Sequence, residues 1–322
     1  MTPRARARAA SSSRAPRPVA PSGSQFELSH GDQRAIVVEV GGALRSYLVS
    51  GHELLDGYGR AERCTSARGH SLIPWPNRLR DGRYSFEGTE HQLPLTEPAN
   101  HNAIHGLVRW ANWAPAAART TERVRMEHIL HPQSGWPFAL ALAIEYSLSD
   151  EGLSVRTSAT NVGAGPCPYG AGAHPYLTLG TERIDALVLQ APGQRHMTTD
   201  ERGIPTGSEP VDGTQFDFLA PRELGETQLD TGYADLRRDQ DGRARVRLAT
   251  AETDRRAALW LDERYPYLML FTGDSLPEPA RRRCGLGIEP MTCAPNALQS
   301  GEGLQVLAPG ESFTSAWGIS PE

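Results

Sequence analysis

Apolar and polar residues alternate along most of the chain, starting near Gln25. Residues 25–31 (QFELSHG) and 34–49 (RAIVVEVGGALRSYLV) place apolar side chains at about every second position and are broken by His-Gly-Asp and Gly-Gly. A period of two is typical of β-strands with one buried face, and glycine pairs are typical of the turns between them. The pattern predicts antiparallel hairpins.

The same alternation returns later in the chain. It recurs at 123–130 (RVRMEHIL), 139–162 (ALALAIEYSLSDEGLSVRTSATNV) and 243–250 (RARVRLAT). Ser149 to Gly152 (SDEG) interrupts the second run and predicts a hairpin turn.

Helical periodicity is weak, and residues 116–122 and 254–261 are expected to form at most short turns. The chain also has 25 prolines and 32 glycines, which suit many tight connections. At 322 residues it has room for two average domains, although one all-β domain often exceeds ~200 residues. We predict an all-β fold, a large antiparallel β-sandwich, in one domain over residues 25–322.

Residues 1–24 (MTPRARARAASSSRAPRPVAPSGS) differ from the rest of the chain. They lack the apolar core of a secretory signal, and their prolines disfavour an amphipathic helix. This composition favours a disordered basic tail. An organelle transit peptide and a translation start placed too far upstream are alternatives that fit the same residues.

Charge, apolar runs, lysine content and cysteine content each exclude some kinds of partner or chemistry. The net charge is −5 although the first 20 residues carry five arginines, so the body is acidic, which argues against nucleic acid as a partner. No apolar run reaches about 18 residues, so no membrane span is expected. The chain has no lysine. Because a Schiff base and a Walker-A phosphate loop both need a lysine amine, the sequence excludes both. Four scattered cysteines without a C-x-x-C pair predict reduced thiols in a cytoplasmic protein.

Three separated blocks hold the residues that suggest chemistry. They are IPWPNRLRDG to NHNAIHG (Ile73 to Gly106), YGAGAHPYLTLG (Tyr169 to Gly180) and LGIEPMTCAPNAL (Leu286 to Leu298). His105, His174 and Glu289 stand out in them. A carboxylate with imidazoles suits proton transfer, with the carboxylate as base and an imidazole as acid.

The setting of Glu289 is unusual for a carboxylate. It stands in an apolar stretch, where burial is expected to raise its pKa toward neutrality. A salt bridge to one of the arginines at 281–283 is the alternative use for Glu289. Cys293 is a less favoured nucleophile, because it has no local basic partner.

Two further motifs are incomplete. His101 and His105 have the spacing of a zinc helix, but residue 102 is Asn rather than the glutamate of a metalloprotease. Gly170 and Gly172 begin a dinucleotide fingerprint in which proline stands where the third glycine belongs. We predict no metal and no cofactor.

Together the blocks resemble the aldose 1-epimerases, the galactose mutarotase-like proteins. The resemblance rests on IPWPNRLRDG with a downstream N-x-x-H-G, an H-x-Y block and a C-terminal E-P-M-T, and it covers the chain from about Gln25 to its end. It implies a galactose mutarotase-like supersandwich. It also implies an isomerase that opens and recloses the ring of a sugar without a metal or a redox cofactor.

The resemblance carries roles onto individual residues. Glu289 corresponds to the base that takes the proton of the C1 hydroxyl, and His174 to the acid that protonates the ring oxygen. His105 and Arg78 resemble residues that hydrogen-bond the ring oxygen and neighbouring hydroxyls. Further expected sugar contacts are Asn77, Tyr176 and Asp230.

Two of these assignments have competitors in the sequence. Asp230, three residues before Tyr233, resembles the D-x-x-aromatic element of the family, and Asp235 is its competitor. Arg80 shares a face with Arg78 in an extended segment but is expected to be a solvated or structural charge. Trp75, between two prolines, suits either the core or a ligand-facing surface.

The expected reaction interconverts the α and β anomers of free aldohexoses, and the expected partner is a monosaccharide. A hexose-6-phosphate 1-epimerase is an alternative, although Arg78 and Arg80 alone offer little grip on a phosphate. A non-catalytic sugar-binding module is the other alternative. The assembly is expected to be a monomer or a homodimer.

Overall fold

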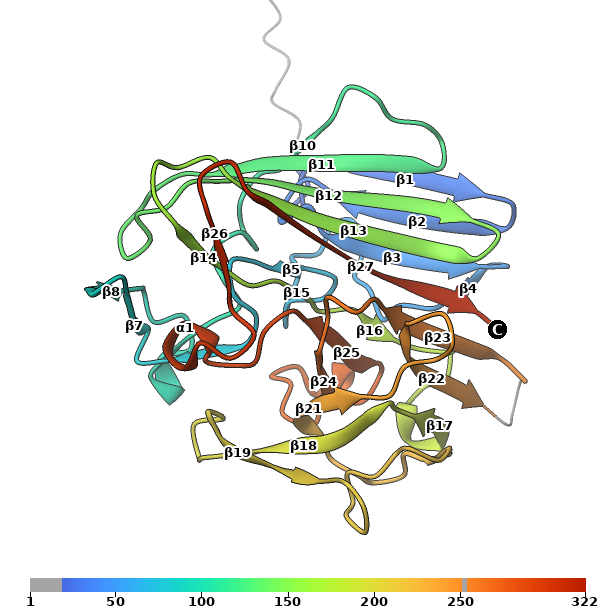
Figure 1. Ribbon diagram of the computed structural model, residues 1–322. Coiled ribbons are helices and arrows are strands. Elements are labelled where there is room, and N and C mark those ends of the chain that lie inside the picture. The colour runs from blue at the N-terminus through green and yellow to red at the C-terminus, as the bar shows by residue number, and fades with distance from the viewer. Residues whose placement is uncertain (1–18, 251–253) are drawn as a thin grey trace, which may run out of the picture.

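The computed structural model describes residues 19–250 and 254–322, which form antiparallel sheets and one short α-helix (Figure 1). The predicted all-β sandwich is confirmed. Residues 1–18 of the predicted tail lie outside the described residues. Ser22 is buried and its carbonyl accepts a hydrogen bond from the N–H of Val40, so the packed structure includes residues just before Gln25.

The largest sheet has nine strands and is built around a long hairpin. β12 (Leu140–Ser149) and β13 (Gly152–Asn161) pair along their whole length, which confirms the hairpin turn predicted at 149–152. Gly152 has a φ of 105°, which glycine adopts without steric cost. In spatial order the sheet contains β10 (Ala114–Pro115), β11 (Arg123–Leu130), β12, β13, β27 (Ser312–Pro321), β23 (Arg256–Leu261), β22 (Ala244–Thr250), β17 (Leu187–Gln190) and β20 (Arg222–Glu223).

The prediction of at most a short turn at residues 254–261 was wrong, because β23 occupies Arg256–Leu261. Five consecutive residues of β23 are buried, since the strand lies inside the sheet between β27 and β22. A strand buried on both faces needs apolar side chains on both, so its sequence lacks the alternation that marks a half-exposed strand.

A four-stranded sheet forms the second layer of the upper half of the molecule (Figure 1). Its first strand packs against β11 and β12. One hydrophobic core connects the layers and extends from Leu28 to Ile319. The strands are β1 (Gln25–His30), β2 (Gln33–Val38), β3 (Leu44–Val49) and β4 (His52–Glu53).

An eight-stranded sheet in the lower half brings the second and third sequence blocks together. Its central strands are short and buried, and they connect through irregular segments rather than tight hairpins. In spatial order they are β19 (Pro205–Pro210), β18 (Gly193–Thr199), β21 (Asp230–Leu236), β24 (Tyr267–Phe271), β25 (Leu286–Met291), β15 (Gly172–Ala173) and β5 (Ser71–Leu72), and β16 (Tyr176–Leu177) also pairs with β25.

Small strand pairs and single turns complete the described chain. The pair β6 (Arg78–Arg80) and β9 (Asn102–Ile104) carries the first sequence block. The others are β7 (Arg83–Phe86) with β8 (Thr89–Gln92), β14 (Cys167–Tyr169) with β26 (Gln305–Leu307), the 3-10 turns at Pro98–Asn100, Ile184–Ala186 and Pro279–Arg281, and α1 (Ala297–Ser300). None of the helices in the described ranges has the length and apolar character needed to cross a bilayer.

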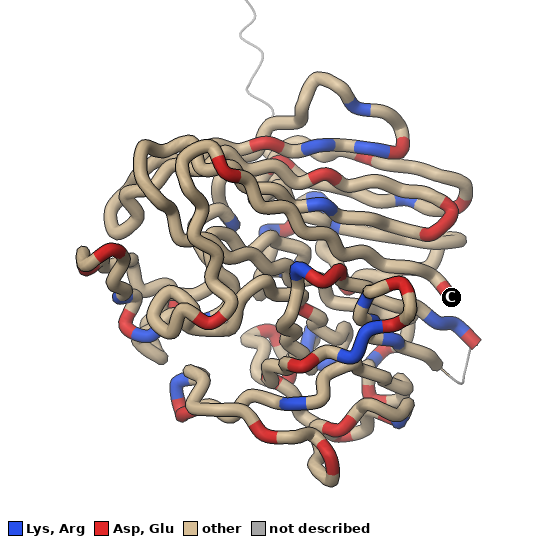
Figure 2. The backbone as a smooth tube through the Cα atoms, viewed as in Figure 1, with Lys and Arg blue, Asp and Glu red and all other residues tan. Residues whose placement is uncertain are grey.

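Arginines and acidic residues alternate along much of the described chain, without one large region of a single sign (Figure 2). On β22, for example, Arg245 and Arg247 both contact Asp239, at 2.7 and 2.8 Å. Such exposed pairs contribute little to stability, at most about 1 kcal/mol each.

Candidate active site

Strand pairing places His174 beside Glu289. Glu289 lies within β25, whose six residues are all buried. Gly172 in β15 and Tyr176 in β16 both pair with β25, on either side of His174. The segment between them therefore runs directly past Glu289, although the two residues are more than a hundred positions apart in the sequence.

The two side chains meet in the interior. Nε2 of His174 lies 3.2 Å from Oε1 of Glu289, and the side chains are 6% and 3% exposed. The ring of His105 lies at an angle of 79° to that of His174, with 5.3 Å between the centroids. All three line a cavity of about 230 Å³, which suits a small ligand.

Burial sets the protonation of this pair. Loss of water raises the pKa of Glu289 to about 8; the nearby Asp230 carboxylate adds to the rise and Arg78 opposes it. Loss of water also lowers the pKa of His174 to about 3, reinforced by Arg109. Near neutral pH the pair thus holds one exchangeable proton, which can lie on the carboxylate or on the imidazole.

Each member of the pair also has a polar atom that lacks a partner among the described residues. These atoms are Nδ1 of His174 and Oε2 of Glu289, and both are fully buried. A buried polar atom without a hydrogen bond costs roughly 1–3 kcal/mol. A hydroxylated ligand in the cavity offers groups that relieve this cost.

His105 is held in one tautomer by the backbone. Its Nδ1 accepts a hydrogen bond from the N–H of Asn77 at 3.2 Å, so in the neutral ring the proton lies on Nε2. Both residues have left-handed backbone conformations, with φ of 55° for Asn77 and 63° for His105. Burial, together with the charge of His174, lowers the pKa of His105 well below its usual value. His105 is therefore a neutral Nε2–H donor at the cavity.

Arg78 reaches the cavity with its guanidinium already bound by carboxylates. Nε and Nη2 contact Glu97 at 3.1 Å, and Nη1 lies 3.5 Å from Oδ2 of Asp230. Glu97 is itself held by Nδ2 of Asn102 at 2.9 Å. A Cβ at Gly203 would lie 2.6 Å from Nη1 of Arg78, so a side chain there would displace the guanidinium, and the φ of 73° also favours glycine. Sequence reasoning missed Glu97, which lies in a loop without a motif.

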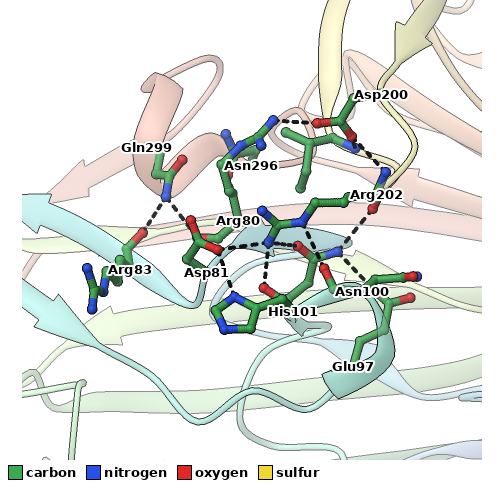
Figure 3. Close-up of polar contacts among 12 residues, drawn as sticks. Arg80, Asp81, Arg83, Glu97, Asn100, His101, Asp200, Arg202, Asn296 and Gln299 are labelled. Atoms are coloured by element: carbon green, nitrogen blue, oxygen red, sulfur yellow. Dashed lines mark hydrogen bonds and ion pairs between the residues drawn. The ribbon is translucent and has the colours of Figure 1, made fainter.

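A polar network fixes the turn that contains Gly203 to the first sequence block (Figure 3). Arg202 binds Oδ1 of Asp81 at 2.9 Å and the carbonyl of His101 at 2.6 Å. Arg80 contacts Asp200 at 2.6 Å. Arg80 and His101 are thus parts of this surface network and do not line the cavity, in agreement with a structural role for Arg80.

Two predicted sugar contacts use their polar groups within the protein. Tyr176 stacks on His174 with 4.9 Å between ring centroids, and its hydroxyl donates to the carbonyl of Ser66 at 3.1 Å. Asn77 accepts a hydrogen bond from the N–H of Arg78 through Oδ1, at 2.8 Å. Both residues line the cavity, and both hold a neighbouring functional side chain in place.

The positions of Asp230, Asp235 and Trp75 in the structure distinguish between the alternatives that the sequence left open. Asp230 lies at the cavity, at the start of β21, whereas Asp235 is not among the residues that line it. Trp75 is 3% exposed and belongs to the hydrophobic core.

A larger open hollow, about 600 Å³, lies at the β7–β8 hairpin and contains none of the predicted residues.

The arginines at 281–283 do not bind Glu289. Arg281 lies 3.2 Å from Asp56, and Arg283 contacts Asp185 and Asp274. The alternative salt bridge for Glu289 is therefore wrong. The physical reason is that the chain turns between residue 283 and β25, which points these side chains to other carboxylates.

Several cavity residues were missed because no motif marks them. Arg109 follows His105 by four positions, and Phe271 comes from the end of β24. The remaining ones are Ser66, Ala67, Ile104, Ser275 and Leu276. Only the fold brings these loops to the same cavity.

A metal is the other ligand that this cluster suggests. His105, His174 and Glu289 each offer one donor atom within 4.8 Å of the others. The tautomer of His105 disfavours this use, because a metal on Nε2 requires the proton on Nδ1. That proton would then face the N–H of Asn77, donor against donor.

Comparison with known proteins identifies the family. The family model "Aldose 1-epimerase" matches residues 24–320, so the chain belongs to the aldose 1-epimerase family. The chain is 32% identical over 291 residues to the uncharacterized protein YihR of Escherichia coli K12, covering 90% of this chain and 91% of that one. It is 30% identical over 159 residues to galactose mutarotase of Rattus norvegicus, covering 47% of this chain and 44% of that protein.

Solved structures agree on the fold. The GalM/aldose epimerase homologue of C. elegans superimposes with a TM-score of 0.83 at 17% identity, covering 93% of this chain and 98% of that one. The predicted galactose mutarotase-like fold is confirmed. The protein is an isomerase of the aldose 1-epimerase family, and this family implies a sugar as substrate.

We expect mutarotation by the purified protein to survive exhaustive dialysis against EDTA. The reason is that His105 presents an N–H, not a lone pair, to the cavity. Rates before and after dialysis, and after addition of Zn²⁺, provide the measurement. Loss of activity that returns with zinc would contradict the expectation and would indicate a metal bound at His105, His174 and Glu289.

Proposed function

We propose that the protein interconverts the α and β anomers of free aldohexoses by acid–base opening and reclosure of the ring. The observation that carries the proposal is the buried His174–Glu289 contact, a proton-sharing pair at a cavity of small-ligand size. The match to galactose mutarotase over about half the chain supports a hexose of this kind.

In the proposed reaction, Glu289 as carboxylate removes the proton of the C1 hydroxyl while His174 as imidazolium protonates the ring oxygen O5. The C1–O5 bond breaks and C1 becomes an aldehyde. Rotation about C1–C2 presents the other face, and the proton transfers run in reverse as the ring closes. Every proton returns to its origin, so no co-reactant is required.

The reacting form needs no additional proton. Below about pH 8 the free pair has one exchangeable proton, which burial favours on Glu289. Moving it to His174 gives the carboxylate and imidazolium that the mechanism uses. Sugar hydroxyls that bond the unpartnered atoms Oε2 and Nδ1 stabilise these charges in place of the missing water.

The other predicted residues then have distinct tasks. His105 donates its Nε2–H to the ring oxygen or an adjacent hydroxyl. Arg78 and Asp230, already paired with each other, hold hydroxyls on the Glu289 side of the cavity. Asn77 and Tyr176 contribute by holding His105 and His174.

Two observations favour free sugars over the alternatives. Arg78 and Arg80 are each neutralised by carboxylates, of Glu97 and Asp200 among others, so they form no phosphate-binding cluster. Burying Glu289 against His174 is costly and is of no use to a module that only binds. These points speak against a hexose-6-phosphate enzyme and against a non-catalytic module.

Polarimetry of freshly dissolved α-glucose, α-galactose and other α-aldoses tests the proposal, with Glu289→Gln as the critical variant. The amide keeps the size of the side chain but cannot take the proton, so the rate should fall about 10²- to 10⁴-fold. Glu263→Gln, at an exposed position on another loop, is the matched control. A folded Glu289→Gln protein with undiminished activity would remove this residue from the mechanism.

The rate should also depend on the proton of the pair. Because burial raises the pKa of Glu289 to about 8, the pair keeps its proton below that pH and loses it above. The acid for O5 is then missing, so kcat/KM should decline by about tenfold per pH unit above about 8. A pH–rate profile, corrected for the uncatalysed reaction, measures this. A kcat/KM that stays level to about pH 10 speaks against a shared proton.

Comparing His174→Asn with Arg78→Ala distinguishes the residue that donates a proton from the residue that binds the sugar. His174 delivers its proton only as the ring opens, so its loss should lower kcat by about 10²-fold or more with little change in KM. Arg78 holds oxygens that are present in the ground state, so its loss should appear largely in KM. Steady-state kinetics on one sugar provide both values. Unchanged kcat in His174→Asn would overturn its assignment as acid.

A further inference from the structure

Arg109 is the unusual arginine of the cavity. It lines the same cavity as His105 and His174 and is partly buried. Nη2 of Arg109 donates a long hydrogen bond to the carbonyl of Ile104, at 3.4 Å. Within residues 19–250 and 254–322, no carboxylate lies within ion-pair distance of it. Arg78, which lines the same cavity, has two carboxylates.

A cation that is partly buried without a nearby anion is destabilised. Burial disfavours the charged guanidinium and lowers the pKa of Arg109. Its charge is felt by the two histidines, whose pKa values it lowers further. An anionic group on the ligand would compensate for this charge and could accept two parallel hydrogen bonds from the planar fork.

The position of Arg109 indicates which part of a sugar it meets, given the proposed function. Arg109 donates to the carbonyl of Ile104, which directly precedes His105, and it lines the cavity together with His105 and His174. In the proposed function these two histidines face the ring oxygen. Arg109 is accordingly placed toward the ring oxygen of a bound sugar. In an aldohexose, the carbon bonded to that oxygen opposite C1 is C5, which carries the exocyclic C6.

The volume of the cavity and the single charge of Arg109 favour a C6 carboxylate over a 6-phosphate. A C6 carboxylate adds one oxygen to the sugar, whereas a 6-phosphate adds a phosphorus and three oxygens. The cavity of about 230 Å³ fits the smaller group better. A single guanidinium also matches a planar monoanion, while a phosphate dianion favours several cationic groups.

We propose that Arg109 is a specificity-determining residue that admits aldohexuronic acids, pairing with their C6 carboxylate while C1 lies at His174 and Glu289. The proposal rests on the proposed function and extends its substrate class beyond neutral aldohexoses. The chemistry at C1 is unchanged, because the carboxylate takes no part in ring opening.

The test compares mutarotation of galactose, galacturonate and galactose 6-phosphate by wild type, Arg109→Gln, Arg109→Lys and Arg63→Gln at low salt. Arg63 is exposed and lies near Trp110 without lining the cavity, so its variant removes the same charge from the same region. The readout is the ratio of kcat/KM for galacturonate to that for galactose, which cancels effects on His174 common to both sugars.

Wild type should accelerate galacturonate at least as well as galactose. Arg109→Gln should lower the ratio by about tenfold or more, as expected for losing a charged hydrogen-bond pair. Arg109→Lys should retain part of it, and Arg63→Gln should leave it unchanged. Three outcomes would each overturn the proposal: an unchanged ratio in Arg109→Gln, a wild type that accelerates galactose but not galacturonate, or a preference for galactose 6-phosphate over galacturonate.

Calorimetry separates this proposal from the proposed function. If no sugar is accelerated, the proposed function fails, and titration of galacturonate into wild type and Arg109→Gln then decides the inference alone. Binding that weakens about tenfold in the variant supports the carboxylate site. Absent or equal binding overturns it. Thermal unfolding of the variants, with Arg109→Lys as the milder change, confirms that they are folded.

Discussion

The contact between His174 and Glu289 is the constraint on which the rest of the structure depends. In water these groups would titrate within a few pH units of each other. Burial raises the pKa of Glu289 and lowers that of His174, so the pair keeps one mobile proton near neutrality. That state exists only while water is kept away from both groups. The fully buried β25 and the sheets around it provide this exclusion.

The backbone around the pair limits how the side chains can be used. Pairing of β15 and β16 with one strand holds His174 from both directions, and the ring of Tyr176 covers its face. The N–H of Asn77 sets the tautomer of His105, which makes this ring a donor and disfavours a metal. The cavity is thereby suited to proton transfer with neutral partners.

The two arginines that line the cavity differ in their surroundings. Arg78 is balanced by Glu97 and Asp230, while Arg109 has no carboxylate within ion-pair distance among the described residues. A neutral sugar leaves Arg109 without an anion, whereas the acidic C6 group that we propose would supply one. The turn at residues 200–203 packs on Arg78 and so borders the balanced arginine.

The sequence by itself determined the all-β class, most hairpins and the three blocks with His105, His174 and Glu289, because alternation, turn residues and motif spacing are local properties. It missed β23, whose two buried faces remove the alternation. It also missed Arg109 and Glu97, and it left the use of Trp75, Arg80 and Asp230 open. Those outcomes depend on which loops meet at one cavity and which carboxylate lies beside each arginine. Only tertiary packing decides them, since it alone sets distance and solvent exposure between residues far apart in the chain.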